Sequence, residues 1–346
     1  MRRIFFSALL LAAALFTSPL QAQVVQPGPD DPSVEQWTVP WESSRPRDPY
    51  VAPDGQVWFV GQRGNYVAVL DPNTSDMKRY EVEDDAFPHT VVVDREGTVW
   101  YAGNRGHHIG RLDPATGAVT RIDMPHPDAS DPHTIAFDQN GDMWFTLQGA
   151  NMIGHMSPET REVQLISLPQ VEGPRGATGN RPYGIKIDSN GQPWIAMLNS
   201  AYIGTVDPAT MEFKRYGLPE GSRSRRLVID SSDRIWYGDW AQGQLGLFDP
   251  ATGEVKEFAD PNGPNSGPYG MAIDEWDRIW YVNTRVSPNR FVGFDPATER
   301  YIANLPIEAG AIRHMYYDAR TRSIWFGTDS NTIGKATVKP PRRGAN

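Results

Sequence analysis

Short apolar runs separated by turn residues recur along most of the chain. From Val91 to Tyr101, three valines lead into Asp-Arg-Glu-Gly, and Thr-Val-Trp-Tyr follows. This order predicts a strand, a tight turn and a second, antiparallel strand. The phrase returns at 135–145, 185–195, 227–237 and 271–281. Because the runs are short and separated by turn signals, the pattern favours many strands over long helices.

Each phrase carries a tryptophan, and the tryptophans recur at spacings of 42, 44, 50, 42, 44 and 45 residues. They are Trp58, Trp100, Trp144, Trp194, Trp236, Trp280 and Trp325. A third strand follows each phrase, as in Ile109-Gly110-Arg111-Leu112. Asp113-Pro114-Ala115-Thr116-Gly117 then suits a turn into a fourth strand. Four strands in each of seven periods predict an all-β fold, a seven-bladed β-propeller.

The two ends of the repeat array complement each other. The last blade supplies three strands and stops near Val338, whereas an extra fourth-strand sequence, Val34 to Pro40, precedes the first blade. We expect this N-terminal strand to complete the last blade and close the ring, which protects both sheet edges. The propeller domain is therefore predicted over residues 34–338, with a disordered tail at 339–346.

The first residues have the pattern of a secretory signal. Arg2 and Arg3 precede an apolar stretch from Ile4 to Phe16, and residues 17–22 end in Leu-Gln-Ala. This arrangement predicts a signal peptide over residues 1–22, a linker over 23–33 and a periplasmic or secreted protein. A buried first helix is the alternative. The apolar stretch is short for a membrane span, and no cysteine follows it to carry a lipid anchor.

Charge and composition exclude several classes of function. The formal net charge is −9, which argues against nonspecific nucleic-acid binding, since that requires a concentrated basic surface. The chain has no cysteine, so disulfides, thiolate metal sites and cysteine nucleophiles are excluded. A closed ring without long helices predicts a monomer.

A polar residue starts the first strand of every blade, eleven residues before its tryptophan. These residues are Arg47, His89, His133, Tyr183, Arg225, Tyr269 and His314. In a propeller this position faces the mouth of the central channel, so the side chains should converge on one pocket. The last blade leaves its register open, because an extra turn residue before Trp325 allows Arg313 to replace His314 in the ring.

This ring suits acid–base chemistry on an acidic substrate. Histidine exchanges protons near neutral pH, and tyrosine assists when its pKa is lowered. Arginine holds a carboxylate or stabilises an enolate through paired hydrogen bonds. Further polar residues follow the tryptophan strands on the same rim: Gln62, Asn104, Gln148, Asp239, Asn283 and Asp329. The structural alternative is that these side chains only cap strand ends and link neighbouring blades.

The repeated phrase Pro-His-x-Ile/Val-x-x-Asp-x-x-Gly-x-x-Trp-Phe/Tyr, followed by Ile-Gly-Arg-Leu-Asp and a closing Leu/Met-Pro, resembles the streptogramin B (virginiamycin B) lyase family. The resemblance covers about residues 34–338. It implies a seven-bladed propeller that opens a cyclic depsipeptide by elimination, with a histidine base and Mg²⁺ stabilising the enolate.

The resemblance also assigns positions to the family's site residues. Its base histidine falls on Arg313 or His314, and its second histidine falls on Tyr269. The glutamate after the last tryptophan strand is matched by Asp329, which the resemblance makes the metal ligand. The glutamate before the base falls on or next to Ile312, where this chain has no carboxylate.

Three functions remain open from the residues. The first is a carbon–oxygen lyase with His314 as base, Tyr269, His133 or His89 handling protons, and Arg47, Tyr183, Arg225 and Arg313 binding substrate. Its substrate would be a small molecule or an acidic, uronate-containing glycan. The second is a non-catalytic binding or scaffold propeller. Lactone hydrolysis is third, since the rim acids Asp239 and Asp329 are few for a carboxylate metal site.

Overall fold

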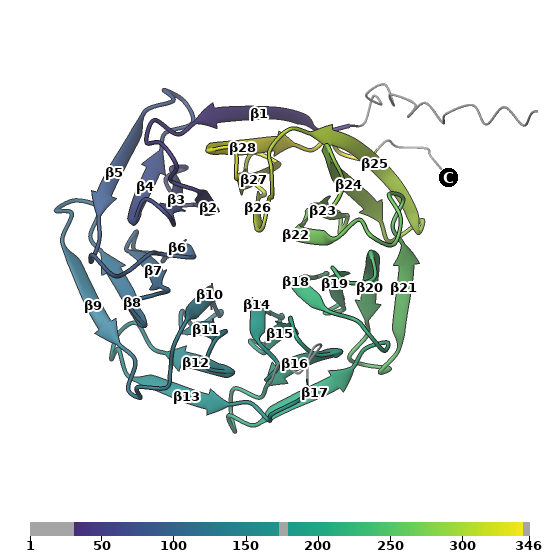
Figure 1. Ribbon diagram of the computed structural model, residues 1–346, viewed down its shortest axis with the longest axis horizontal. Coiled ribbons are helices and arrows are strands. Elements are labelled where there is room, and N and C mark those ends of the chain that lie inside the picture. Colours follow the sequence, from purple (N-terminus) through teal and green to yellow (C-terminus); the bar gives the residue numbers. More distant parts are fainter. Residues whose placement is uncertain (1–30, 173–178, 342–346) are drawn as a thin grey trace, which may run out of the picture.

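The structure, a computed structural model, describes residues 31–172 and 179–341, and the regular secondary structure of these residues is entirely β-strand. The strands form seven four-stranded sheets set around a central axis like the blades of a propeller (Figure 1). The predicted seven-bladed β-propeller is therefore confirmed. In the described part of the chain, no helix has the length and apolar character needed to cross a membrane.

Several predictions concern residues at the ends of the chain. The predicted signal peptide at 1–22, residues 23–30 of the linker and residues 342–346 of the tail lie outside the described residues.

The strands of each blade follow one another from the axis outward. The first two blades contain β2 (Pro46–Val51), β3 (Val57–Gly61), β4 (Tyr66–Leu70) and β5 (Met77–Glu81), then β6 (Val91–Val93), β7 (Val99–Gly103), β8 (His108–Leu112) and β9 (Val119–Asp123). The next two contain β10 (Pro132–Phe137), β11 (Met143–Leu147), β12 (Met152–Met156) and β13 (Val163–Ser167), then β14 (Pro182–Ile187), β15 (Pro193–Met197), β16 (Tyr202–Val206) and β17 (Phe213–Gly217). The fifth and sixth contain β18 (Ser224–Ile229), β19 (Ile235–Asp239), β20 (Gln244–Phe248) and β21 (Val255–Ala259), then β22 (Pro268–Ile273), β23 (Ile279–Asn283), β24 (Asn289–Asp295) and β25 (Arg300–Ile307).

The seventh blade combines the two ends of the described chain. Its inner strands are β26 (Met315–Asp318), β27 (Ser323–Gly327) and β28 (Thr332–Thr337), and its outer strand is β1 (Ser33–Thr38). β1 pairs antiparallel with β28, from Ser33 opposite Thr337 to Thr38 opposite Thr332. Figure 1 shows β1 lying along the outside of this blade, next to the first blade.

The repeated aspartate and tryptophan have a structural role in five blades. The indole Nε1 of Trp236 donates a hydrogen bond to Asp230 over 2.8 Å, and the same bond joins Trp280 to Asp274. The other oxygen of each aspartate accepts backbone N–H groups of the turn, such as that of Arg278. A spacing of six residues thus closes the turn and fixes the indole. The buried Trp325 Nε1 lacks such a partner among the described residues.

Side chains packed between the blades form the core, and the glycine of the repeated Ile-Gly or Leu-Gly pair makes that packing possible in several blades. A Cβ atom on Gly246 would lie 2.0 Å from Cζ of Tyr237, and one on Gly110 would lie 1.9 Å from Cζ of Tyr101. Both rings are fully buried. The glycine therefore lets an aromatic ring of the second strand lie flat over the third strand.

Candidate functional site

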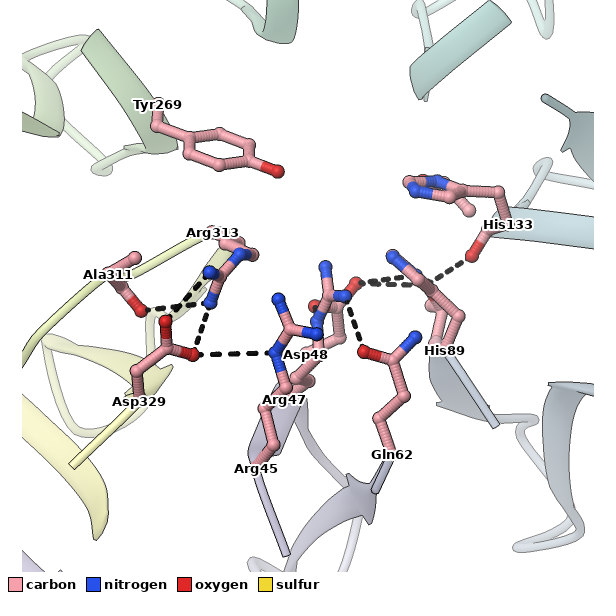
Figure 2. A network of polar contacts seen from close by, with 12 residues as sticks. Arg45, Arg47, Asp48, Gln62, His89, His133, Tyr269, Ala311, Arg313 and Asp329 are labelled. Carbon is pink, nitrogen blue, oxygen red and sulfur yellow. Dashed lines mark hydrogen bonds and ion pairs between the residues drawn. The ribbon is translucent and has the colours of Figure 1, made fainter. Parts of the chain in front are cut away.

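The first strands of the blades start at one face of the ring and enclose a cavity there of about 490 Å³. Its lining includes the residue at the ring position of each blade: Arg47, His89, His133, Tyr183, Arg225, Tyr269 and Arg313. We call this cavity the mouth pocket. The convergence expected from the repeat is therefore present, and Figure 2 shows six residues of the site's polar network facing the same space from three sides: Arg47, Arg313, Tyr269, His89, His133 and Gln62.

Strand register decides between Arg313 and His314. In the other six blades, the ring residue lies three positions before the residue paired with the tryptophan, as Tyr183 precedes Lys186 opposite Trp194. In the last blade Trp325 pairs with Tyr316, so the ring position belongs to Arg313. The extra turn residue between β26 and β27 shifts the count from Trp325. The placement of His314 as a base at the mouth is therefore wrong, and His314 lines a different cavity.

A buried polar layer lies one residue deeper along the strands. Arg226 donates hydrogen bonds to Thr134 over 3.0 Å and to Asp48 over 3.3 Å, and Thr90 donates to Asp48 over 2.9 Å. Burial acts to raise the pKa of Asp48, but Arg226 and the neighbouring positive groups hold that pKa below its ordinary value. Sequence reasoning missed this layer. The available signal was a polar residue directly after several ring residues.

The two ring histidines lie in close contact in the buried wall of the pocket, with their ring planes tilted by 35°. The centroids of His89 and His133 are 3.5 Å apart, and each side chain is 3% exposed. Burial, together with Arg47 and Arg226, lowers the pKa of both imidazoles well below the ordinary value. Both rings are therefore neutral at physiological pH. They can accept or donate one hydrogen bond each, but neither stores a positive charge.

The Tyr183 ring packs beside His133, with ring centroids 4.1 Å apart, and its hydroxyl shares a hydrogen bond with the hydroxyl of Tyr269. Burial acts to raise the pKa of Tyr269, but the guanidiniums of Arg225 and Arg47 outweigh burial and hold it below its ordinary value. Burial and its neighbour raise the pKa of Tyr183 to about 12. The difference follows from position, since Arg225 Cζ is 4.5 Å from the Tyr269 ring and 5.9 Å from that of Tyr183.

Five arginines make the mouth pocket strongly basic. Arg47, Arg225 and Arg313 were expected there, whereas Arg45 and Arg181 were missed. The missed pair occupies the position before a strand-starting proline, where φ is +53° at Arg45 and +52° at Arg181. That repeated position was the signal. Buried Arg47 Nε and Nη2 and Arg225 Nε have no hydrogen-bond acceptor among the described residues, and Arg47 Nε lies 3.6 Å from Oδ1 of Asp48.

Rim amides orient some of these cations. Gln62 accepts a hydrogen bond from Arg47 over 2.8 Å, and Gln148 accepts one from Arg181 over 3.0 Å. Asn104 instead binds the carboxylate of Asp131, the one acidic residue among those that line the pocket. The predicted rim residues Asp239 and Asn283 do not join them, because their side chains bind loop backbone and Asp260, respectively.

Comparison with known proteins gives a consistent picture. Residues 32–178 match the model of the virginiamycin B lyase family. The predicted resemblance to that family is confirmed. The fold matches virginiamycin B lyase from Staphylococcus aureus with a TM-score of 0.78 and 21% identity, covering 89% of this chain and 100% of that one. No curated protein sequence matches the chain.

Two further solved structures show the same fold. A streptogramin B lyase structure matches with a TM-score of 0.78 and 22% identity, over 89% of this chain and 98% of that one. The extracellular domain of the one-component system BT4673 from B. thetaiotaomicron matches with a TM-score of 0.67 and 17% identity, over 90% and 43%. At these identities, the likeness establishes the architecture.

The position that the virginiamycin B lyase resemblance gives to a base histidine is occupied by Arg313 here. Its guanidinium binds both oxygens of Asp329, with Nη2 2.7 Å from Oδ2. Arg45 Nε lies 3.4 Å from the same carboxylate (Figure 2). Ala311, two residues before Arg313, contributes a backbone oxygen and no carboxylate. Asp329 therefore anchors two arginines at the mouth.

The donor set around Asp329 does not fit Mg²⁺. Magnesium requires several oxygen ligands, with carboxylates offsetting its charge. Both oxygens of Asp329 already face guanidiniums, and five arginines surround the pocket. A possible acidic site lies elsewhere, where Asp138, Asp142 and His155 approach one another. Asp138 is already engaged there by turn N–H groups and by Trp144.

Proposed function

We propose that the protein is a carbon–oxygen lyase that acts on a carboxylate-bearing substrate in the mouth pocket. The observation that carries the proposal is Tyr269, a buried phenol whose pKa the guanidiniums of Arg225 and Arg47 hold below its ordinary value. A phenol of this kind serves as a general base nearer to neutral pH than an ordinary tyrosine. Uronate-containing glycans are the substrate class that this basic pocket suits best.

The reaction is a β-elimination. Tyr269 takes the proton on the carbon next to the substrate carboxylate, and the negative charge spreads onto the carboxylate oxygens. A carbon–carbon double bond then forms as the carbon–oxygen bond at the β position breaks. Tyr269 returns its proton to the leaving oxygen, so the products are an unsaturated acid and an alcohol. One residue thus acts as base and then as acid.

The arginines supply the charge stabilisation that elimination requires. Arg47 and Arg225 carry buried N–H groups without acceptors among the described residues, and both guanidiniums lie close enough to influence Tyr269. Paired N–H groups match the geometry of a carboxylate, and they bind the doubly charged enolate more strongly than the ground state. No step of the proposed reaction passes through a metal, because the donor set at Asp329 does not fit one.

The experiment is incubation of the purified protein with oligogalacturonate, monitored by ultraviolet absorbance of the new conjugated double bond. We expect product from the wild type, none from Tyr269→Phe, and none with a neutral oligosaccharide of equal length. A parallel incubation with a streptogramin B antibiotic, analysed by mass spectrometry, tests elimination at the family's type of ester. A ring-opened product of unchanged mass would make the depsipeptide the substrate. Absence of turnover on both substrates would refute the lyase assignment.

The second candidate is a binding propeller without catalysis. The excess of arginine over acid in the mouth pocket favours it, because an anion would be held there without any chemistry. Titration calorimetry with oligogalacturonate distinguishes the two candidates. Binding that is lost in Arg225→Gln, together with no unsaturated product at any enzyme concentration, would support the binding propeller over the lyase.

We further propose that the protein acts as a monomer in the periplasm or outside the cell. The leader-like residues Arg2 to Ala22 support this location, and the matched B. thetaiotaomicron structure is itself an extracellular domain. Mass determination of the protein recovered from the periplasmic and culture fractions tests the location, since removal of residues 1–22 would leave a product beginning at Gln23.

A further inference from the structure

The face of the propeller opposite the mouth pocket carries a second cavity, of about 410 Å³. The strands lead from one to the other: Tyr183 lines the mouth pocket, and Lys186, three residues further along β14, lines the second cavity. No lining residue is shared between the two cavities. We call the second one the far pocket. Its volume lies in the range of small-molecule sites.

Apolar and aromatic side chains form much of the far pocket's wall, and the polar residues Thr90, Arg95, Asp138 and Gln139 also line it. Val92, Ile135 and Phe137 line it, together with the paired rings of Tyr50 and Tyr316, whose centroids are 4.7 Å apart. This wall suits the flat or apolar body of a ligand. It contrasts with the mouth pocket, where charged and amide groups predominate.

Lys186 is the amine in this wall. Across residues 31–172 and 179–341, no carboxylate lies within ion-pair distance of its Nζ and no acceptor takes a hydrogen bond from it. Burial and the guanidinium of Arg226 lower the pKa of Lys186 to about 8, against a smaller opposite effect of Asp48. Asp48 is already bound to Arg226 and Thr90. Arg226 therefore already balances the charge of Asp48, and Lys186 is not its counter-ion.

His314 stands beside Lys186 in the same wall. Its buried Nδ1 has no hydrogen-bond partner among the described residues. Burial lowers the pKa of His314 to about 3 against the opposing effect of Asp48, and Arg226 and Lys186 lower it further. The imidazole is neutral, and it can therefore exchange a proton with the amine or with a bound hydroxyl. His314, which the count from Trp325 placed at the mouth, thus lies in the far pocket. The reaction proposed for the mouth pocket does not use it.

We infer that the far pocket is a carbonyl-binding site in which Lys186 forms a reversible imine with a small aldehyde or ketone that has an aromatic or apolar body. The geometry carries this inference: an unpaired amine, a neutral imidazole and an apolar wall meet in one cavity. It is independent of the lyase proposal, because it uses none of the residues that line the mouth pocket.

The chemistry balances without a further reactant. The Lys186 amine attacks the carbonyl carbon, and a carbinolamine forms as the nitrogen loses a proton and the oxygen gains one. The carbon–oxygen bond then breaks, the oxygen leaves as water with the second amine proton, and a carbon–nitrogen double bond remains. His314 is positioned to move these protons. A desolvated lysine beside another cation is a known way to obtain such an amine.

The test uses benzaldehyde as the probe and the intact wild-type chain at pH 7.5. Sodium cyanoborohydride traps the imine as a stable benzyl adduct, and peptide mass spectrometry measures labelling at each lysine over time. Lys214 is the internal reference, since it is an exposed lysine on another strand. We expect Lys186 to be labelled at least about tenfold faster than Lys214, because far more of it is unprotonated at this pH.

Two variants complete the design. Lys186→Met should remove only the fast phase of labelling, whereas Lys214→Met should leave that phase unchanged. His314→Asn should slow the labelling of Lys186 while near-ultraviolet circular dichroism shows a folded protein. Labelling of wild-type Lys186 at or below the rate of Lys214 would overturn the inference without any variant. Because the mouth pocket is separate, this result would leave the lyase proposal standing.

Discussion

The hydroxyl groups of Tyr183 and Tyr269 share one hydrogen bond across the mouth pocket, although the residues belong to different blades and lie 86 positions apart. The two phenols differ in environment, because Arg225 lies nearer to Tyr269. Ionisation of Tyr269 is therefore favoured, and Tyr183 is left as the hydrogen-bond donor. In the proposed reaction, Tyr269 is therefore the base, and Tyr183 stabilises its ionised form.

This asymmetry predicts different losses for two matched substitutions. Tyr269→Phe removes the proposed base and should reduce kcat by about 10²-fold to 10⁴-fold, the usual contribution of acid–base catalysis. Tyr183→Phe removes only a hydrogen bond to the base and should cost about tenfold or less. Steady-state kinetics on oligogalacturonate would measure both. Equal losses in the two variants would contradict the assignment of Tyr269 as base.

The pH dependence follows from the same arrangement. A general base must be deprotonated to act, so kcat/KM should rise with pH and level off once Tyr269 is ionised. Arg225 helps to lower the pKa of Tyr269, so Arg225→Gln should move the rise upward by about one pH unit. Arg285→Gln is the matched control, because Arg285 stacks on Trp240 and does not line the mouth pocket. An unchanged profile in Arg225→Gln would remove this arginine from the mechanism.

Chelation separates the proposed reaction from the metal-dependent reaction implied by the family resemblance. Arginines surround the substrate position, and Asp329 is bound to Arg313 and Arg45. We therefore expect turnover to be unchanged, within about twofold, after dialysis against EDTA. Loss of turnover on chelation and its recovery with Mg²⁺ would contradict the metal-free reaction proposed here.

The fold offers a separate test at the repeated glycines. An alanine at Gly246 would place its Cβ within 2.0 Å of the buried Tyr237 ring. Overpacking of this kind costs about 1–3 kcal/mol or more. Gly217→Ala is the control, because nothing lies within 4 Å of a Cβ at that position, and we expect it to change stability by less than about 1 kcal/mol. Urea unfolding monitored by tryptophan fluorescence would compare them, and equal stabilities would contradict the packing role.

The fold was predictable from the sequence because each blade repeats the same local physics. Asp230 and Trp236 are six residues apart because the turn between them and their hydrogen bond require that spacing. The corresponding pairs in other blades repeat it. The last blade departs from this spacing, so counting from Trp325 placed His314 at the mouth. Pairing of Trp325 with Tyr316 shows that the inserted residue is absorbed by the turn. Counting residues back from Trp325 cannot show whether the inserted residue lies in the turn or within the strand.

The candidate site was predictable in part for the same reason. Ring residues such as His89 occupy a repeated position, so their convergence follows from symmetry. The buried layer does not follow from the repeat, because its polar residues have no counterparts in the blades where Gly184 and Gly270 hold that position. A Cβ on Gly184 would lie 3.1 Å from Cα of Arg226. The layer thus depends on contacts between blades distant in sequence, which repeat spacing does not encode.

The buried ion pair of Asp48 and Arg226 allows two predictions about stability. It joins the first and fifth blades across the axis over 3.3 Å, with both side chains almost fully buried. Asp48→Asn would leave a buried guanidinium without its charge partner, a change that typically destabilises a protein by about 3–5 kcal/mol. The double variant Asp48→Asn/Arg226→Gln should lose less stability than the sum of the two single variants, because it leaves neither charge of the pair buried without a partner.

The pair also sets a pH dependence of stability. Asp48 has a lower pKa in the folded protein than its ordinary value of 3.8. The folded state therefore binds fewer protons than the unfolded state. The contribution of the Asp48 carboxylate to the free energy of unfolding is complete well above pH 3.8, and it is lost as the pH falls through the lower pKa of the folded protein. Denaturant unfolding of the wild type and Asp48→Asn between pH 7 and pH 3 should show their stabilities converging toward the acid end. A difference in stability between the two proteins that stays constant over this range would mean that the charge of the Asp48 carboxylate does not stabilise the propeller.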